Sequence, residues 1–115
     1  PGNDPHQDIA RKLSVSPELF LVGTDGAGAL IASVMVGYDG HRGWINYLAV
    51  HPTCQRQGHA RRLMERAEQL LAERGCPKLN LQVREGNEAV IAFYESLGYS
   101  NDKTVSLGKR LIADI

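Results

Sequence analysis

The chain has 115 residues, 43% of them hydrophobic, and its 13 Lys and Arg balance its 13 Asp and Glu. This composition fits one globular domain over residues 1–115 and excludes an intrinsically disordered chain, which would combine low hydrophobicity with a net charge. A net charge of zero argues against a general nucleic-acid binder, because phosphate recognition needs a basic excess. No run approaches the roughly 18 apolar residues of a membrane span and no leader pattern opens the chain, so we expect a cytoplasmic protein.

The first half of the chain predicts one helix and three strands. An Asn-Asp-Pro start predicts a short helix from Asn3 to Leu13. Three β-like runs follow, Leu19 to Gly23, Leu30 to Tyr38 and Trp44 to Val50, separated by Asp-Gly turn signals. We expect three consecutive antiparallel strands, with the glycines near Asp25 serving a hairpin turn.

The second half predicts two helices and two further strands. Apolar residues recur at helical spacing from Gly58 to Arg74, and the alternating run from Leu79 to Val83 predicts a half-buried strand. Asn87 can cap a second helix that Gly98 closes, and Val105 to Ile112 is a candidate final strand.

This order of elements indicates an α+β fold, an α/β three-layer domain with a mixed central sheet flanked by helices. The helix from Gly58 to Arg74 is a crossover that places Leu79 to Val83 parallel to Trp44 to Val50. Cys54 and Cys76 have neither metal-ligand nor C-x-x-C spacing, so we expect no metal.

The most informative segment is the loop that enters the first of these two helices. Helix starts expose unpaired N–H groups and favour acids, yet no acid appears here before Glu65. The basic residues at this end are Arg56, His59, Arg61 and Arg62. An anion bound at the helix start would explain them, with Gly58 allowing close backbone approach and Ala60 keeping the next turn low. The alternative is that Arg61 and Arg62 are solvated surface residues.

Two motifs, one in this loop and one in the helix after Asn87, resemble motifs of a known family. The run from Pro52 to Leu63, PTCQRQGHARRL, closely resembles the acetyl-CoA-binding motif of the GNAT superfamily of N-acetyltransferases, whose pattern is Q/R-x-x-G-x-G/A. The run from Asn87 to Tyr99, NEAVIAFYESLGY, resembles the superfamily's next motif, with Val90 where alanine is usual. The resemblance starts near Leu19, and details such as GYDGHRG resemble the YpeA-type branch.

The resemblance implies an enzyme that moves the acetyl group of acetyl-CoA directly to a primary amine of a protein, peptide or small molecule. Backbone groups of Leu48 to Val50 would pair with the pantetheine arm, and N–H groups from Gln55 to Arg61 would hold the pyrophosphate. The cofactor-binding residues so implied are Leu48, Ala49, Val50, Gln55, Arg56, Gln57, Gly58, His59, Ala60, Arg61, Asn87 and Tyr94.

Two groups are implied to be catalytic. The backbone N–H of Leu48 would polarise the thioester carbonyl. Tyr94 would act as general acid toward the departing thiolate, although an aromatic residue in an apolar stripe is more often part of a core. Asn87 would contact the pantetheine arm while capping its helix.

The general base stays open. Many relatives place a glutamate on the strand equivalent to Trp44 to Val50, but the polar candidates on this strand are Asn46 and Tyr47. The alternatives are Glu85, Asp39, His41 or a water chain held by Tyr47. His51 and His59 are expected to serve loop geometry or phosphate contact. Cys54 lies too far along the cofactor for a covalent route, so we expect direct transfer in a ternary complex.

Two other functions compete with catalysis. A CoA-binding sensor module would need no base, and a grip on RNA or DNA by the basic cluster would be strongly salt-dependent. The expected partners are therefore acetyl-CoA and an amine acceptor, with no nucleic acid and no membrane. The family's first strand and helix have no counterpart before Asn3, which would leave Leu19 to Gly23 as a sheet edge able to pair with a second copy in a homodimer.

Overall fold

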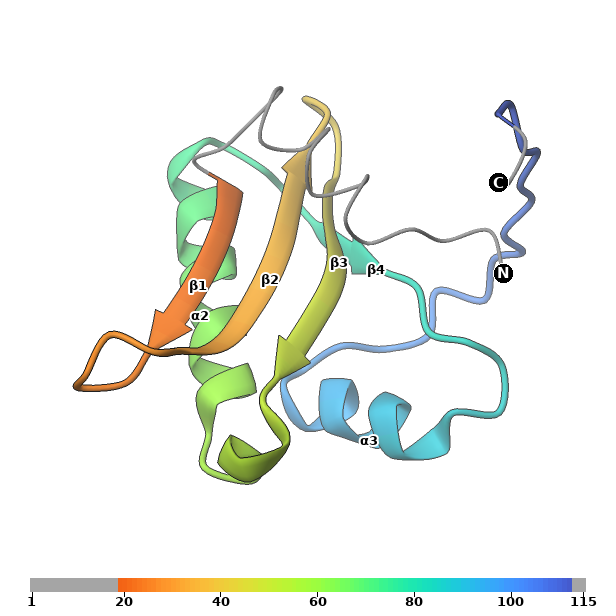
Figure 1. Ribbon diagram of the computed structural model, residues 1–115. Coiled ribbons are helices and arrows are strands. Elements are labelled where there is room, and N and C mark those ends of the chain that lie inside the picture. The colour runs from red at the N-terminus through yellow and green to blue at the C-terminus, as the bar shows by residue number, and fades with distance from the viewer. Residues whose placement is uncertain (1–18, 113–115) are drawn as a thin grey trace. The chain divides into compact units, whose positions relative to one another are not determined.

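The structure is a computed structural model that describes residues 19–112. The helix expected from Asn3 to Leu13 lies outside the described residues. The strands are β1 (Phe20–Thr24), β2 (Leu30–Tyr38), β3 (Gly43–Val50) and β4 (Leu79–Leu81) (Figure 1). The helices are the short 3-10 turn η2 (Pro52–Cys54), α2 (His59–Glu73) and α3 (Glu88–Ser96). Up to residue 82 the described chain forms one compact unit, and residues 83–112 belong to a second.

The first unit is a mixed sheet with strand order β1-β2-β3-β4. The pairs β1-β2 and β2-β3 are antiparallel, as the three consecutive strands predicted. Strand β4 pairs parallel to β3 through Trp44 opposite Asn80 and Ile45 opposite Leu81. The expected crossover through α2 and the α+β fold class are therefore confirmed.

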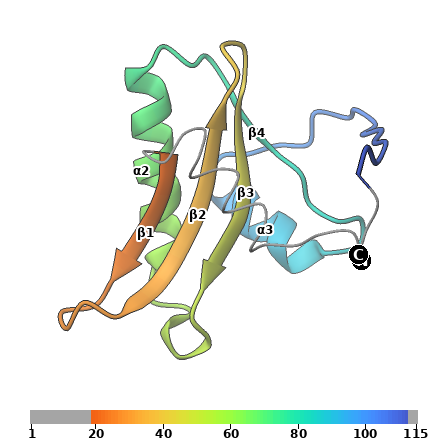
Figure 2. The same ribbon diagram turned by 45° about the horizontal axis from the view of Figure 1, so that its top comes forward.

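Helix α2 lies along one face of this sheet (Figures 1 and 2). Its buried residues are Leu63, Met64, Ala67 and Leu71, spaced as a single helical stripe. Val34 and Val36 of β2 are fully buried, as is Met64. Burial of this stripe against the central strand provides the core of the unit.

The start of β3 is packed tightly. A Cβ at Gly43 would lie 2.7 Å from Leu71 Cδ1 and 3.1 Å from Cys76 Sγ, so only glycine fits without a shift. The Gly43 N–H donates to the Lys78 carbonyl at 2.9 Å. These contacts bring the end of α2 and the entry into β4 against one end of β3.

The second unit contains α3 and the segment that follows it. The Asn87 side chain accepts a hydrogen bond from the Val90 N–H, as a cap does, and Gly98 closes the helix with φ 98°. The rings of Phe93 and Tyr99 meet Tyr94 edge to face, with centroids 5.1 and 5.7 Å away.

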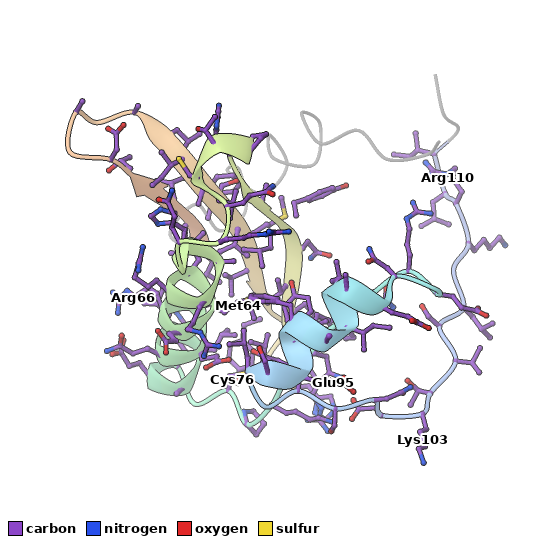
Figure 3. The ribbon with its side chains drawn as sticks, turned by 90° about the horizontal axis from the view of Figure 1, so that it is seen from below. Met64, Arg66, Cys76, Glu95, Lys103 and Arg110 are labelled. Carbon is purple, nitrogen blue, oxygen red and sulfur yellow. The ribbon has the colours of Figure 1, made fainter. Side chains whose placement is uncertain are left out.

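The strand predicted from Val105 to Ile112 is wrong. Residues 101–110 form neither helix nor strand, and Val105, Leu107 and Leu111 are 84%, 92% and 88% exposed. A strand is stabilised by a hydrogen-bonded neighbour, and none of the four described strands pairs with this segment. Figure 3, with Lys103 and Arg110 labelled, shows this extended path.

In the described range, no helix combines the length and apolar character required to cross a membrane.

Candidate functional site

The central feature of the candidate site is the open end of β3. Strand β4 pairs with Gly43, Trp44 and Ile45, and none of the described strands pairs with the same edge of β3 from Asn46 to Val50. Strand β4 ends at Leu81, two residues before the predicted end at Val83. The edge formed by Asn46 to Val50 is called the open edge below.

A β-bulge interrupts β3 at the start of the open edge. Ser33 pairs with Ala49 and Met35 pairs with Asn46, so Val34 faces two residues of β3, Tyr47 and Leu48. Tyr47 has φ 53°, a left-handed conformation that is uncommon outside glycine. Bulges redirect backbone groups and occur often beside active sites. The sequence did not predict this bulge.

The loop after β3 is tied to the sheet by side chains. The backbone N–H of His51 donates to the Ile31 carbonyl at 2.7 Å, and the His51 side chain accepts the Thr53 N–H at Nδ1, at 3.2 Å. The Gln55 amide donates to the Val50 carbonyl at 3.4 Å. The expectation that His51 serves loop geometry agrees with these bonds, whereas the Gln55 anchor was not predicted. Cys54 is half-buried in this loop, beside the Thr53 hydroxyl.

Backbone N–H groups gather where this loop enters α2. Arg56 and Gly58 have φ 64° and 83°, and no side chain caps the helix. The first helical hydrogen bond runs from Arg62 N to Gly58 O at 3.0 Å, so the N–H groups of His59, Ala60 and Arg61 precede the helical ladder. With no acid in its first turn, this end of α2 suits an anion.

The basic side chains at this end take different positions. Arg62 folds back over the loop, with Nη2 2.7 Å from His59 Nδ1 and 3.3 Å from the Gln57 carbonyl oxygen. His59 Nδ1 therefore accepts a hydrogen bond, which assigns the ring hydrogen to Nε2, 3.3 Å from Gln57 Oε1. All three arginines, Arg56, Arg61 and Arg62, are exposed.

Tyr94 and Asn87 belong to the second unit. Tyr94 is 9% exposed, and burial raises the pKa of its phenol above the usual 10.0. The hydroxyl therefore keeps its proton at neutral pH. Asn87 caps α3, and its side chain accepts the Val90 N–H at 3.4 Å.

The candidate bases lie in different places. Asp39 accepts the backbone N–H groups of Arg42 and His41, each at 2.8 Å, and these bonds lower the pKa of its carboxyl, making it a weak base. His41 shares this turn, which precedes Gly43. At 3.3 Å per residue, Gly43 lies about 17 Å along the strand from Leu48. Glu85 is exposed in the second unit, and Tyr47 lies at the bulge.

The part of the chain that the structure describes holds no cluster of three His, Cys, Asp or Glu residues able to bind a metal ion.

Comparisons with known proteins agree on one family. A model of the acetyltransferase (GNAT) family matches residues 2–99. The chain is 56% identical over 114 residues to "Acetyltransferase YE1169" of Yersinia enterocolitica. The aligned residues are 99% of this chain and 80% of that protein.

Solved structures give the same result. Chaetomium thermophilum Naa20, solved with a bisubstrate analogue, matches with a TM-score of 0.75 and 27% identity, over 85% of this chain and 58% of that one. The ribosomal-protein-S18-alanine N-acetyltransferase of Escherichia coli matches with a TM-score of 0.70 and 32% identity, over 83% of this chain and 60% of that one. The chain thus spans less than two thirds of either structure. Because the family match extends over most of its length, the chain belongs to the acetyltransferase (GNAT) family.

Proposed function

We propose that this protein transfers the acetyl group of acetyl-CoA directly to a primary amine in a ternary complex. The observation that carries the proposal is the continuity of the open edge of β3 with the uncapped start of α2. One stretch of chain thus offers an unpaired strand edge for an extended amide-bearing arm and then N–H groups for phosphates. The bisubstrate analogue bound to Naa20 supports a site that holds both substrates together.

Acetyl-CoA would bind along this stretch in one orientation, with its pantetheine arm on β3 and its pyrophosphate at the start of α2. Backbone groups of Leu48 to Val50 would hydrogen-bond to the two amides of the pantetheine arm, as an added strand would. The N–H groups of His59, Ala60 and Arg61, with the loop from Gln55 to Gly58, would hold the pyrophosphate. Asn87 would add a side-chain contact to the arm.

The reaction needs a polarised carbonyl and one proton donor. The N–H of Leu48, redirected by the bulge, would donate to the thioester oxygen. As the amine nitrogen attacks the carbonyl carbon, a C–N bond forms and the C–S bond breaks. The Tyr94 hydroxyl would give its proton to the departing thiolate, which suits a phenol that stays protonated at neutral pH.

The amine must also lose a proton. We assign this step to water held near Tyr47, because the bulge lies beside Leu48 while Asp39 and His41 lie beyond the other end of β3. The proton would leave through that water to solvent.

A second candidate function is a CoA-binding sensor without catalysis. It is favoured by one observation, the absence of any acidic residue on β3 from Gly43 to Val50. Sensor and enzyme share the cofactor contacts and differ in the chemical step alone.

Calorimetry followed by a thiol-release assay separates the two candidates. We expect acetyl-CoA to bind, and free CoA thiol to appear only when an acceptor from a panel of peptide amines, amino acids and polyamines is added. Binding without release on any amine would favour the sensor, and no binding would contradict both. Mass spectrometry of the product would identify the acylated nitrogen.

A further inference from the structure

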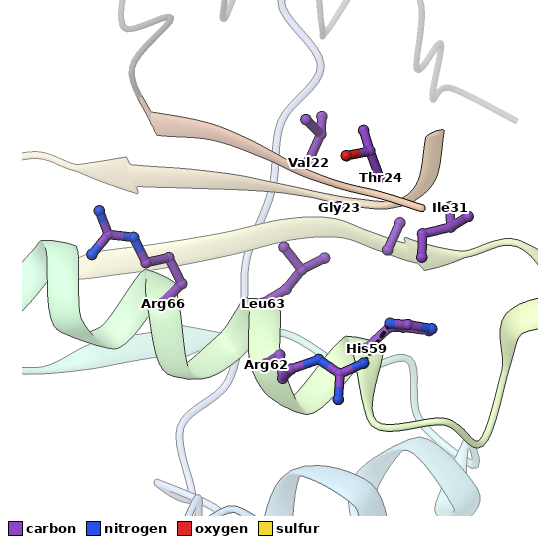
Figure 4. Close-up of a pocket in the computed structure, with 9 residues that line it drawn as sticks. Val22, Gly23, Thr24, Ile31, His59, Arg62, Leu63 and Arg66 are labelled. Atoms are coloured by element: carbon purple, nitrogen blue, oxygen red, sulfur yellow. Dashed lines mark hydrogen bonds between the residues drawn. The ribbon is translucent and has the colours of Figure 1, made fainter. Parts of the chain in front are cut away.

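A cavity lies between the sheet and the first turns of α2, away from the open edge of β3. Its volume is about 340 Å³. Its apolar lining comes from Ile31 and Ala32 on β2 and Leu63 on α2, whereas the Val22 side chain points away from α2 (Figure 4). A pocket of this size holds a ligand of one ring or a few carbon atoms with a polar group.

The polar lining of the cavity is cationic. The positive charge comes from Arg62 and Arg66, which line it beside the neutral ring of His59, and no carboxylate is among the lining residues. Figure 4 shows both arginines projecting from α2, with Arg62 turned toward His59.

Neither guanidinium group has an acidic partner among residues 19–112. Arg62 meets the Gln57 carbonyl and His59, and Arg66 Nη1 donates to Gln69 Oε1 at 2.9 Å. Asp25, which follows the lining residue Thr24, accepts two backbone N–H groups of its own turn, those of Ala27 and Ala29 at 2.9 Å. The positive charge of this cavity is therefore uncompensated by the described chain.

The cavity is also distinct in position from the proposed cofactor path. It is lined by β1, β2 and α2, and none of its lining residues belongs to β3. The strand order is β1-β2-β3-β4, and the open edge of β3 is the edge that faces away from β2. Strands β2 and β3 therefore lie between β1 and the open edge. His59 also belongs to the proposed phosphate loop, and Arg62 reaches that loop through its hydrogen bond to the Gln57 carbonyl.

We propose that this cavity binds a compact organic anion other than the acetyl-CoA cosubstrate, with an apolar body and a phosphate or carboxylate group. The apolar body packs against Ile31, Ala32 and Leu63. The anionic group accepts charge-assisted hydrogen bonds from Arg62 and Arg66. Such a ligand satisfies both halves of the lining, which inorganic phosphate alone does not.

Two substitutions test the site by different physical effects. Arg66→Gln removes one cation without touching the loop that Arg62 contacts. Gly23→Val fills the cavity instead, since a Cβ at Gly23 lies 3.7 Å from Ala32 Cβ, an ordinary contact, and the backbone is already extended. Arg74→Gln, at the other end of α2, removes the same charge outside the cavity and serves as the matched control.

The probe is phenyl phosphate, compared with inorganic phosphate and benzyl alcohol by calorimetry on the full chain with and without saturating CoA. We expect saturable binding of phenyl phosphate, at least about tenfold tighter than of either half-probe and retained with CoA present. Arg66→Gln and Gly23→Val should each weaken it about tenfold or more, and Arg74→Gln should not.

Four results would overturn the proposal: no saturable binding, equal affinity for inorganic phosphate, binding unchanged by both cavity substitutions, or competitive displacement by CoA. The last result would assign the cavity to the cosubstrate. Circular dichroism of each variant separates a lost site from a lost fold.

Discussion

The two ends of β3 differ although they belong to one strand. From Gly43 to Ile45 the strand is flanked by β2 and β4, and Gly43 is packed against Leu71 and Cys76. From Asn46 to Val50 it pairs with β2 alone, after a bulge at Tyr47. The closed end is paired on both sides and closely packed, and the open end can present hydrogen-bonding groups without loss of the fold.

The loops at these two ends differ in the same way. The turn before Gly43 is closed by the Asp39 carboxylate, which accepts two backbone N–H groups. The loop after Val50 is held by His51 and Gln55 but leaves the start of α2 uncapped. A turn that needs no ligand satisfies its own donors, whereas a binding loop keeps them available.

The largest expected effect concerns the proton for the departing thiolate, which the open end of β3 cannot supply. Tyr94→Phe should lower turnover by about 10²–10⁴-fold, because the departing thiolate loses its acid. The KM for acetyl-CoA should change little in steady-state thiol-release assays. Tyr99→Phe, which removes a neighbouring phenol, should keep turnover near that of the parent protein. Equal turnover in Tyr94→Phe and the parent protein would remove Tyr94 from the acid role.

The next effect should fall on the open end alone. Gly58→Ala places a side chain at φ 83°, with its Cβ 3.3 Å from Arg62 Nη1. The left-handed strain of about 1–2 kcal/mol should shift the phosphate loop and raise the KM for acetyl-CoA about tenfold. Gly40→Ala is the matched control. It carries the same strain at φ 90°, but its Cβ meets no atom within 4 Å, and it lies in the turn before the closed end of β3. If both variants raise KM equally, the two ends do not differ in function.

A smaller effect should fall on the closed end. Gly43→Ala should cost about 1–3 kcal/mol of unfolding free energy, because the added methyl group overlaps Leu71 Cδ1. Urea denaturation measures this cost, and kcat of the folded fraction should be unchanged. Gly23→Ala, whose Cβ meets only ordinary contacts, is the matched control. A similar loss in both variants would show that close packing at Gly43 is not the cause.

The smallest effect concerns Asp39. Backbone N–H bonds from Arg42 and then His41 lower the pKa of the Asp39 carboxyl below the usual 3.8. The charged carboxylate therefore stabilises the fold above pH 3.8. This stabilisation is lost as the pH falls through the lowered pKa and the carboxyl is protonated. Asp39→Asn should therefore lower Tm slightly at pH 7, with the difference shrinking at pH 3. The pH–rate profile between pH 6 and 9 should match the parent protein. Turnover lowered about 10²-fold or more across this whole range would instead make Asp39 the general base.

Most of the fold followed from periodicity and turn residues. The Leu30 to Tyr38 run became β2 with the same bounds, and the helix and parallel strand after it formed where alternation and glycine predicted. Strand β4 is shorter than predicted, because its pairing with β3 ends at Ile45 opposite Leu81, and no local pattern reports where such pairing ends. The 105–112 run alternates as a strand does but lacks a described partner.

The candidate site was predicted by composition more than by geometry. The charge order around Gly58 indicated an anion, and the structure adds the uncapped helix start that such an anion would meet. The left-handed residues Tyr47 and Arg56 were not predictable, because neither is a glycine. One weak signal existed at Tyr47: it and Leu48 are consecutive large residues that break the alternation of the strand.

The open edge of β3 should also be visible without any turnover. Backbone amides that lack a neighbouring strand exchange their hydrogens with solvent far faster than amides inside a ladder. Deuterium uptake between Asn46 and Val50 would then be rapid in the free protein and slow once acetyl-CoA is bound. A mass spectrum of one peptide could thus report occupancy of the site while the acceptor is still being sought.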